Sequence, residues 1–241
     1  MKQQNSVDIV IPVYNEEVEL EESILKLHKF LTKNLSEFRW NITIADNASV
    51  DHTQMISRQL THKLPRLSYI RLSDKGRGRA VKKAWKESKA DICMYMDVDL
   101  STDLKSIRPM LSALTNGSDI GIGSRLLPGA KVVGRALKRE VLSRVYNILI
   151  KLMFFVHFSD AQCGFKAVTR KVVRELIPKI QDNAWFFDSE LLIIGEKLGY
   201  KIHEEPVYWV DNPGSTVRVL GTVRGDLEGL WRLFKCRPWR K

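Results

Sequence analysis

Two acidic residues separated by a single residue follow a short apolar run near the middle of the chain. The run CMYM (93–96) leads directly into Asp97, Val98 and Asp99, and Ser101 follows two positions later. Because alternate side chains of an extended chain share a face, Asp97, Asp99 and Ser101 can direct oxygen atoms toward one point. Hard oxygen ligands suit Mg²⁺ or Mn²⁺, and such ions commonly bridge protein carboxylates and a substrate diphosphate. The alternative is that these acids cap the next helix or lie in solvent.

A second candidate is the segment DKGRGR (74–79), which places Lys75, Arg77 and Arg79 around two glycines. Glycine allows the backbone to approach a ligand closely, and the cations can contact phosphate oxygens. The segment matches neither the P-loop nor the dinucleotide-binding fingerprint. It predicts a phosphate contact, with an ordinary surface turn as the alternative.

The elements that would position these residues alternate regularly over the first hundred residues. The predicted strands are 7–14, 40–46, 67–73 and 91–97, and the predicted helices are 17–35, 51–60 and 78–89. This alternation, with nearly all-apolar strands, predicts a mostly parallel, Rossmann-like α/β sheet with helices on both faces. Ligands of such sheets bind beyond the carboxyl ends of the strands. The segments YNEE, DNASVD, SDKGRGR and DVDLS follow the four strands, so this edge of the sheet is the candidate site.

After residue 103 the alternation becomes less regular. The sequence predicts a helix at 104–115, a strand at 119–124, a loop at 125–134, a helix from about Thr169, a strand at 204–210 and a last helix. The apolar segment 145–158 is broken by Lys151 and follows a basic flank, which predicts a helix at a membrane interface. This flank consists of Arg135, Lys138, Arg139 and Arg144.

The last predicted helix combines an apolar stripe with many basic residues. Its apolar residues are Val223, Leu227, Leu230 and Phe234, and its basic residues are Arg224, Arg232, Lys235, Arg237, Arg240 and Lys241. The stripe favours packing on the domain, and the charge favours attraction to anionic lipid. We expect both, so the C-terminal part of the chain is predicted to be an interfacial helical region.

The composition of the 241 residues restricts the possible partners and compartments. Thirty-nine Lys and Arg against 28 Asp and Glu give a formal charge of +11 and a pI of about 9.6. This charge favours a nucleic acid, an anionic membrane surface or a phosphorylated substrate. The three cysteines have no disulfide or zinc spacing and fit a reducing compartment. We expect one domain over 1–241, with no signal-peptide pattern and no apolar segment of the roughly 18 to 20 residues that cross a bilayer.

Seven segments occur in the order found in family 2 glycosyltransferases with the GT-A fold. They are VDIVIPVYNEE, ADNASVD, DKGRGRAV, DVDLS, GSRLLPG, SDAQCGFKAV and FDSELL. The chain more closely resembles the polyprenyl-phosphate hexosyltransferases, which include the dolichyl-phosphate mannose and glucose synthases. This resemblance covers Val7 to about Phe234. It implies a nucleotide-binding half at 1–103 and an acceptor-binding half with basic amphipathic helices at 104–241.

The resemblance also implies roles for individual residues. Asp97 and Asp99, with Ser101 as a third oxygen ligand, would hold Mg²⁺ or Mn²⁺ against the diphosphate, and Asp46 would read the base. The expected nucleotide-sugar contacts are Pro12, Tyr14, Glu16, Asp46, Lys75, Arg77, Asp97, Val98 and Asp99. The expected acceptor-phosphate contacts are Arg125, which also lies near the transferred sugar, Arg139, Arg144 and Arg218.

The sequence departs from the family pattern at three places. The usual Asp-Asp-Gly-Ser after the second strand is Asp46-Asn47-Ala48-Ser49, so the family pattern does not define the exact base contact. The familiar Ser-Lys pair near PGSTVR is absent, so Arg218 is the expected cation of that segment. The family pattern includes C-terminal membrane helices, and we expect none in this sequence.

The chemistry of the acceptor decides whether a base is needed. A phosphate monoester has its second pKa at about 6, so it is largely dianionic at pH 7 and can attack without losing a proton. A sugar hydroxyl would need a general base, which Asp188 or Glu190 in FDSELL could supply. The alternative is that these two carboxylates orient a neighbouring arginine or cap a helix.

We therefore predict an inverting, metal-dependent hexosyltransferase at the cytoplasmic face of a membrane, with Asp97, Asp99, Arg125 and Asp188 as catalytic residues. The expected donor is UDP-glucose or GDP-mannose, and the expected acceptor is a polyprenyl phosphate. One alternative is a GT-A glycosyltransferase that acts on a sugar hydroxyl of a glycan or glycolipid. Others are a silent scaffold and a basic nucleic-acid-binding module, whose usual motifs are absent. We expect no nucleic acid partner and leave open a separate transmembrane partner.

Overall fold

The central feature of the fold is a sheet whose strands run mostly parallel. The computed structural model describes residues 4–211 and 219–240. Within these residues the sheet has seven strands in the order β3-β2-β1-β4-β7-β5-β8. In this order their bounds are Leu67–Arg71, Arg39–Asp46, Ser6–Val13, Ile92–Met96, Phe165–Thr169, Ile120–Ser124 and Ile202–Pro206. Among these strands β7 alone is antiparallel to its neighbours, β4 and β5, so the predicted mostly parallel α/β sheet is confirmed.

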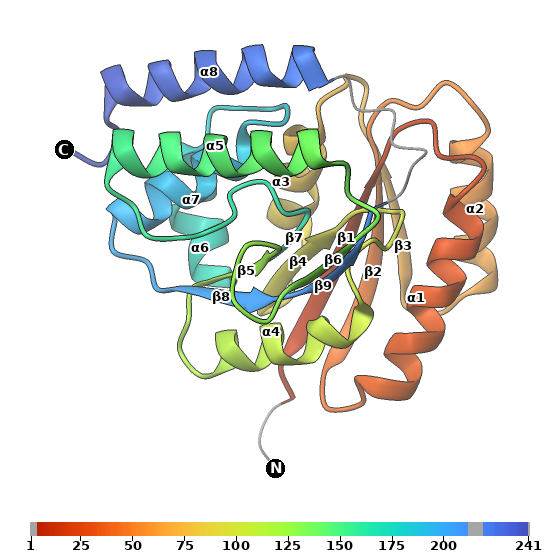
Figure 1. The fold of residues 1–241 in the computed structure, drawn as a ribbon. Helices are drawn as coiled ribbons and strands as arrows, with labels where there is room; N and C mark the ends of the chain where they lie inside the picture. Colours follow the sequence, from red (N-terminus) through yellow and green to blue (C-terminus); the bar gives the residue numbers. More distant parts are fainter. Residues whose placement is uncertain (1–3, 212–218, 241) are drawn as a thin grey trace.

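Helices connect the strands and cover both faces of the sheet (Figure 1). They are α1 (Leu20–Asn34), α2 (Thr53–Lys63), α3 (Arg77–Glu87), α4 (Ile107–Thr115), α5 (Leu137–Phe154), α6 (Arg170–Glu175), α7 (Phe187–Lys197) and α8 (Val219–Cys236). Short 3₁₀ turns lie at Leu104–Ser106 and Ile177–Lys179. A small second sheet pairs β6 (Lys131–Val133) with β9 (Tyr208–Val210).

Two hydrophobic cores, one on each face of the sheet, hold these layers together. Val10 of β1 packs into the core that α3, α5, α6, α7 and α8 share, whereas Ile9 and Ile11 pack into the core of α1, α2 and α4. This division follows from the alternation of side chains along a strand. Strands β4 and β5 are buried along their whole length. Such strands appear in a sequence as continuous apolar runs, which is why the sequence located them.

Several predicted elements have different bounds in the structure; for example, the loop predicted at 125–134 contains the short strand β6. The strand predicted at 204–210 is divided into β8 and β9 at Pro206, because proline has no N–H to donate to a sheet. The chain changes partners there, since β8 pairs with β5 and β9 pairs with β6. The helix predicted at 145–158 begins earlier, at Leu137, and ends at Phe154. Of the helices in the described ranges, none combines the length and the apolar character needed to cross a membrane.

Candidate functional site

The loops that follow β1, β2 and β4 lie at the carboxyl edge of the sheet, where the sequence predicts the site. β1 lies between β2 and β4 and runs parallel to both. Each loop contains a non-glycine residue with a positive φ: Asn15 (55°), Ala48 (62°) and Leu100 (49°). Residues other than glycine adopt this conformation at an energetic cost, and strained backbone of this kind concentrates at functional sites. Three such residues at one edge support the predicted location.

Contacts among the loops after β1, β2 and β3 position several of the predicted nucleotide-sugar contacts. The backbone N–H of Glu16 donates to Thr53 Oγ1 (2.8 Å), which ties the first loop to α2. Lys75 Nζ lies 3.5 Å from the centre of the Tyr14 ring, which joins the third loop to the first. Pro12 is the penultimate residue of β1. The structure therefore brings these predicted residues to one corner of the edge.

Asp46, predicted to read the base, is fully buried beneath the loops. Its Oδ1 accepts a bond from the backbone N–H of Ser49 (2.8 Å), and its Oδ2 accepts from the Tyr69 hydroxyl (2.7 Å). Burial and the bond to Asp46 raise the pKa of Tyr69 to about 12, so this hydroxyl stays protonated. Asp46 thus shapes the loop after β2, and a direct contact with a base stays a prediction.

The acidic pair lies directly after β4. Asp99 accepts bonds from the backbone N–H (3.0 Å) and the hydroxyl (2.7 Å) of Ser101. Asp97 Oδ1 lies 2.5 Å from Nη2 of Arg77, the first residue of α3. Val98 between the two acids is buried. The structure therefore brings together the three predicted oxygen ligands and adds a guanidinium to them.

Excess negative charge surrounds this acidic pair. Burial, followed by the charges of Glu19, Asp99, Asp51 and Asp97, raises the pKa of Glu16 to about 7. The pKa of Asp99 is also raised, by burial and then by Asp97. Among the described residues, no group of three or more His, Cys, Asp or Glu side chains could hold a metal ion. Asp97 and Asp99 supply two hard oxygen ligands, so a divalent cation held there would need its other ligands from a diphosphate and water.

Gly164, which the sequence analysis did not assign, restricts the position of the Asp97 carboxylate. Its carbonyl accepts a bond from the Asp97 N–H (3.2 Å). A Cβ atom at residue 164 would lie 1.8 Å from Asp97 Oδ2, a distance at which the carboxylate would have to move. The segment before β7 is therefore in direct contact with the acidic pair after β4. Its sequence signal was QCGFK, one of the segments that carry the family resemblance.

A buried charge network connects Arg77 with α7. Arg77 Nη1 lies 2.7 Å from Asp188 Oδ2, and Lys166 Nζ lies 3.0 Å from Asp188 Oδ1. The hydroxyl of Tyr95 also donates a bond to Asp188. Burial alone would raise the pKa of Asp188, but Lys166 and Arg77 outweigh burial and lower it. Asp188 is therefore an ionised carboxylate that both cations neutralise.

These contacts bear on the base that a hydroxyl acceptor would need. Glu190, the other candidate, is buried and lies 2.9 Å from Nη1 of Arg232. Because both carboxylates of FDSELL are buried and ion-paired, the geometry favours the alternative interpretation, in which Asp188 orients Arg77. Lys166 was not among the predicted site residues, since a lysine in a short apolar strand gives no sign of its partner.

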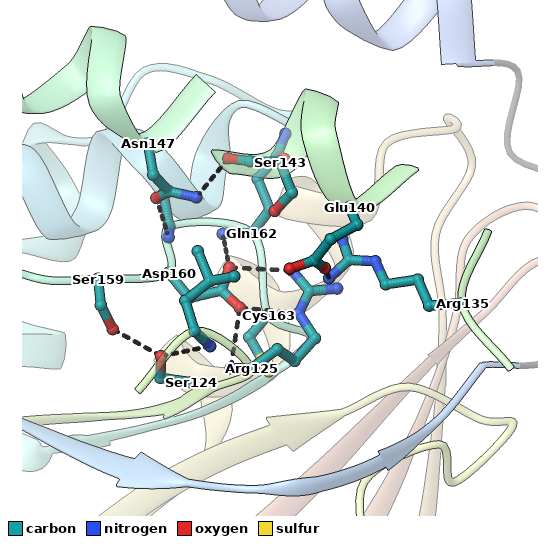
Figure 2. Close-up of polar contacts among 12 residues, drawn as sticks. Ser124, Arg125, Arg135, Glu140, Ser143, Asn147, Ser159, Asp160, Gln162 and Cys163 are labelled. Atoms are coloured by element: carbon teal, nitrogen blue, oxygen red, sulfur yellow. Dashed lines mark hydrogen bonds and ion pairs between the residues drawn. The ribbon is translucent and has the colours of Figure 1, made fainter. Parts of the chain in front are cut away.

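A buried arginine–aspartate pair lies at the end of β5 (Figure 2). Arg125 Nε and Nη2 donate to the two oxygens of Asp160 at 2.7 and 2.9 Å, a bidentate geometry. Burial alone would raise the pKa of Asp160, but Arg125 outweighs it and lowers the pKa to about 2. The guanidinium also lies over the Trp209 ring, 5.0 Å from its centre. Arg125, predicted to contact the acceptor, is thus held in a fixed orientation.

The other cations predicted for the acceptor phosphate lie in three different situations. Arg139 pairs with Asp211 (3.1 Å). Arg144 pairs with Glu140 (2.6 Å) one turn away on α5, and its side chain is largely exposed. Arg218 lies outside the described residues.

Two residues without a predicted contact complete the surroundings of Arg125. Arg135 is a nearly buried side chain that pairs with Glu140 (3.1 Å). Burial and then the positive charge of Arg125 lower the pKa of Arg135, so the two guanidinium groups repel each other. Ser143 of α5 is buried, and its Oγ has no hydrogen-bond partner among the described residues. Figure 2 shows both residues around the Arg125–Asp160 pair, where an anion would satisfy the hydroxyl and relieve the repulsion.

A surface cavity of about 490 Å³ lies at the opposite edge of the sheet. Its lining includes Ser6, Asp8 and Arg39, at the amino ends of β1 and β2, and Lys89 beyond α3. It contains none of the predicted site residues. The carboxyl edge, where the loop strain, the acidic pair and the buried arginines meet, is therefore the candidate site.

The comparisons with known proteins identify the family of this chain and agree with its fold. The family described as Glycosyl transferase family 2 matches residues 8–177. Glycosyltransferase AglD of Haloferax volcanii is 31% identical over 237 residues, which are 96% of this chain and 38% of AglD. The dolichyl-phosphate beta-glucosyltransferase of Dictyostelium discoideum is 31% identical over 222 residues, which are 87% of this chain and 68% of that protein.

A solved structure with 14% sequence identity shows the same fold. It is glucosyl-3-phosphoglycerate synthase from Mycobacterium tuberculosis in complex with Mn²⁺, UDP-glucose and phosphoglyceric acid. The TM-score is 0.71, and the similarity covers 96% of this chain and 80% of the synthase. This similarity over nearly the whole chain confirms the predicted fold class.

Proposed function

The chain belongs to glycosyl transferase family 2, and from this premise we propose that it transfers a hexose from a nucleotide-diphosphate sugar to a polyprenyl phosphate. One observation carries the proposal: a single loop, 159–164, contacts both an acidic and a basic region. Gly164 in this loop contacts Asp97, and Asp160 in the same loop holds Arg125. A carboxylate pair for a cation and its diphosphate thus lies beside cations for a second phosphate. Asp97 and Asp99 come from residues 1–103, whereas Arg125 and Asp160 come from 104–241.

The donor binds at the acidic region. Asp97 and Asp99 would hold Mg²⁺ or Mn²⁺, and the ion supplies charge that stabilises the departing diphosphate. Arg77, which Asp188 and Tyr95 hold from below, keeps the Asp97 carboxylate in place. Tyr14, Glu16 and Lys75 border the space that a nucleotide would enter. The similarity to a synthase crystallised with UDP-glucose supports UDP-glucose as the first donor to test, with GDP-mannose as the alternative.

The acceptor phosphate binds at the basic region. Because a phosphate monoester is already dianionic at neutral pH, it needs positive charge and orientation, and no base. Asp188 is paired with Arg77, and Glu190 is paired with Arg232. These ion pairs agree with a reaction that uses no carboxylate base. The bonds of Arg125 to Asp160 use Nε and Nη2, so we assign Nη1 to the acceptor. Direct attack by the phosphate on the sugar, opposite the departing diphosphate, inverts the configuration of the transferred hexose.

The lipid part of the acceptor requires access to a membrane, and α5 and α8 provide a suitable face. α5 exposes an apolar stripe, and α8 beside it exposes three further large apolar residues. The stripe consists of Leu137, Val141, Val145, Ile148, Leu152 and Phe155, and the residues of α8 are Val223, Leu227 and Trp231. Basic residues flank these positions, namely Lys138, Arg144, Lys151, Arg224 and Lys235. We call this the α5/α8 face and propose that it lies on the cytoplasmic surface of a membrane that contains anionic lipid.

Phe155, the last residue of this stripe, also has an unusual backbone conformation. It follows α5 in the left-handed conformation, with a φ of 52°, and 78% of its surface is exposed. Both features are unfavourable in water. The conformation strains a residue with a Cβ atom, and the exposed ring lacks the stabilisation that burial of an apolar side chain gives. Insertion of the ring among lipid chains would offset the second cost.

The proposal is tested by transfer assays with labelled UDP-glucose and GDP-mannose and a panel of acceptors. The panel contains a polyprenyl phosphate, the matching polyprenol and oligosaccharides, each with and without Mn²⁺. We expect metal-dependent transfer to the polyprenyl phosphate alone. Transfer to the oligosaccharides would instead support an enzyme that acts on a sugar hydroxyl, and transfer that ignores Mn²⁺ would contradict the role of Asp97 and Asp99.

A further inference from the structure

The inward side of α8 carries a carboxyl group in an apolar setting. Asp226 is 4% exposed, and the neighbouring inward residues Leu230 and Leu233 are each 1% exposed. One turn along, a Cβ atom at Gly229 would lie 2.3 Å from the Phe186 ring, so α8 packs closely here. The Oδ2 of Asp226 accepts a bond from Gln162 Nε2 (2.9 Å).

The second oxygen of this carboxyl group, Oδ1, is buried and has no partner among the described residues. A buried polar atom without a hydrogen bond destabilises the folded state, and an apolar side chain of similar size would seat the helix better. Burial, followed by the charges of Asp188 and Asp182, also raises the pKa of Asp226 to about 7. The packing of α8 therefore does not explain why a carboxyl group occupies this position.

A continuous series of hydrogen bonds leads from Asp226 to the acceptor region. The bond to Asp226 orients the side-chain amide of Gln162, and the backbone N–H of Gln162 donates to Asp160 Oδ1 (3.2 Å). Asp160 in turn accepts the two bonds that orient Arg125. Figure 2 shows Gln162 beside Asp160 and Arg125. Three residues, Asp226, Gln162 and Asp160, thus link α8 to the guanidinium of Arg125, and the step from Gln162 to Asp160 is made by the Gln162 backbone.

We propose that Asp226 is a positioning residue for the acceptor site and that it acts on Arg125 through Gln162 and Asp160. The inference rests on the proposed function, because α8 belongs to the α5/α8 face that we place on the membrane. Seating of α8 on the lipid surface and orientation of Arg125 are then coupled through a single buried contact. The enzyme aligns its acceptor-binding arginine best when α8 is in place.

The test compares Asp226→Leu with Asp226→Asn in transfer to a short, water-soluble prenyl phosphate, so that membrane binding does not enter. The Leu variant loses the bond to Gln162, and we expect its acceptor KM to rise about tenfold, the size of effect that misplacing a positioning group produces. The Asn variant keeps an oxygen acceptor for Gln162 and should remain within about twofold of wild type. Donor affinity and the melting temperature should not fall in either variant. Glu228→Gln, on the exposed side of the same helix, serves as the control.

Gln162→Met tests the same link from its other end, and it serves if Asp226→Leu does not fold. The double variant should show the acceptor KM of one single variant, because both remove one contact. Equal acceptor KM values for Asp226→Leu and wild type, additive effects in the double variant, or a parallel loss of donor affinity would overturn the inference. If wild type uses neither the short prenyl phosphate nor the polyprenyl phosphate, the proposed function fails and this inference fails with it.

Discussion

The donor side and the acceptor side of the proposed site treat charge in opposite ways. On the donor side, Glu16 and Asp99 have raised pKa values, because burial and neighbouring carboxylates oppose their ionisation. On the acceptor side, the pKa of Asp160 is lowered to about 2, because Arg125 outweighs the burial. The first region has a surplus of negative charge that an incoming cation would neutralise. In the second region Asp160 pairs with Arg125, so the orientation of the guanidinium is fixed before any ligand binds.

Carboxylates therefore serve two different purposes at one edge of this sheet. A carboxylate with excess negative charge around it attracts a ligand, whereas a carboxylate in a bidentate pair orients its partner. The two regions should therefore respond differently to substitution: the donor side through binding of metal and diphosphate, and the acceptor side through alignment.

The largest effect is expected on the donor side, for Asp99→Asn. The substitution removes a charge and a ligand from the proposed cation site, and we expect kcat/KM to fall on the order of 10³-fold, as for loss of a main electrostatic contact. Calorimetric titration of UDP-glucose and GDP-mannose should show that Mn²⁺-dependent binding is lost. Asp74→Asn, which changes an exposed carboxylate after β3, is the control. Mn²⁺-dependent donor binding that survives in Asp99→Asn would contradict the assignment.

A smaller effect, confined to the acceptor, is expected for Arg125→Lys. Lysine keeps the charge but loses the bidentate bond to Asp160, so we expect the acceptor KM to rise about 10- to 100-fold. Donor affinity should stay unchanged, which separates this variant from Asp99→Asn. Arg108→Lys, at an exposed pair on α4, is the matched control. An unchanged acceptor KM and turnover in Arg125→Lys would mean that Arg125 does not contact the acceptor.

Gly164→Ala tests the loop that joins the two sides. The added Cβ would displace the Asp97 carboxylate, and we expect Mn²⁺-dependent donor affinity to fall about tenfold. Gly225→Ala on α8 is the matched control, because a Cβ atom there meets nothing within 4 Å. Donor affinity is measured by titration and stability by thermal melting, for both variants. Equal donor affinities would show that the contact at Asp97 is not needed for binding.

The smallest effect is a pH dependence of stability that belongs to the donor side. The pKa of Glu16 is about 7 in the folded protein against an ordinary value of 4.5. The contribution of Glu16 to stability is thus fully present below about pH 4.5 and is lost as the pH rises through 7. We expect the melting temperature of wild type, relative to Glu16→Gln, to fall by a few degrees between pH 5 and pH 8.

Mn²⁺ should raise the melting temperature of wild type more at pH 8 than at pH 5, because the ionised donor side binds the cation more tightly. The raised pKa of Asp226 contributes equally to wild type and Glu16→Gln, so it cancels in their difference. If the difference in melting temperature between wild type and Glu16→Gln does not change between pH 5 and pH 8, the pH dependence does not come from ionisation of Glu16.

The sequence predicted the donor side better than the acceptor side, for a topological reason. In a parallel sheet the residues after each strand share one edge, so Asp97, Asp99 and Lys75 could be placed together from their positions alone. β7 runs antiparallel between β4 and β5, so the residues before it, including Asp160 and Gly164, lie at that same edge. No pattern of strands and helices announces such a reversal, and these residues entered only through the family resemblance.

Pairing was the second property that the sequence did not reveal. Asp188 and Arg125 were predicted as catalytic residues from their motifs, but their partners lie far away in the chain. Asp188 meets Arg77 and Lys166, and Arg125 meets Asp160. A carboxylate that serves as a base and one that orients an arginine look alike in a sequence, because only the fold decides which cation approaches.

The bond between Arg77 and Asp188 has a consequence for the order in which the molecule assembles. The two residues are 111 positions apart, so a chain that emerges from the ribosome presents β1 to β4 and the acidic pair long before Asp188 is available. Contacts so distant in the sequence form slowly, since a long loop must close before they contribute any stability. The sheet can therefore begin to form while its site is incomplete. A chain interrupted before residue 188 would display Asp97 and Asp99 without the network that orients them, which makes catalytic competence one of the last properties that the growing protein acquires.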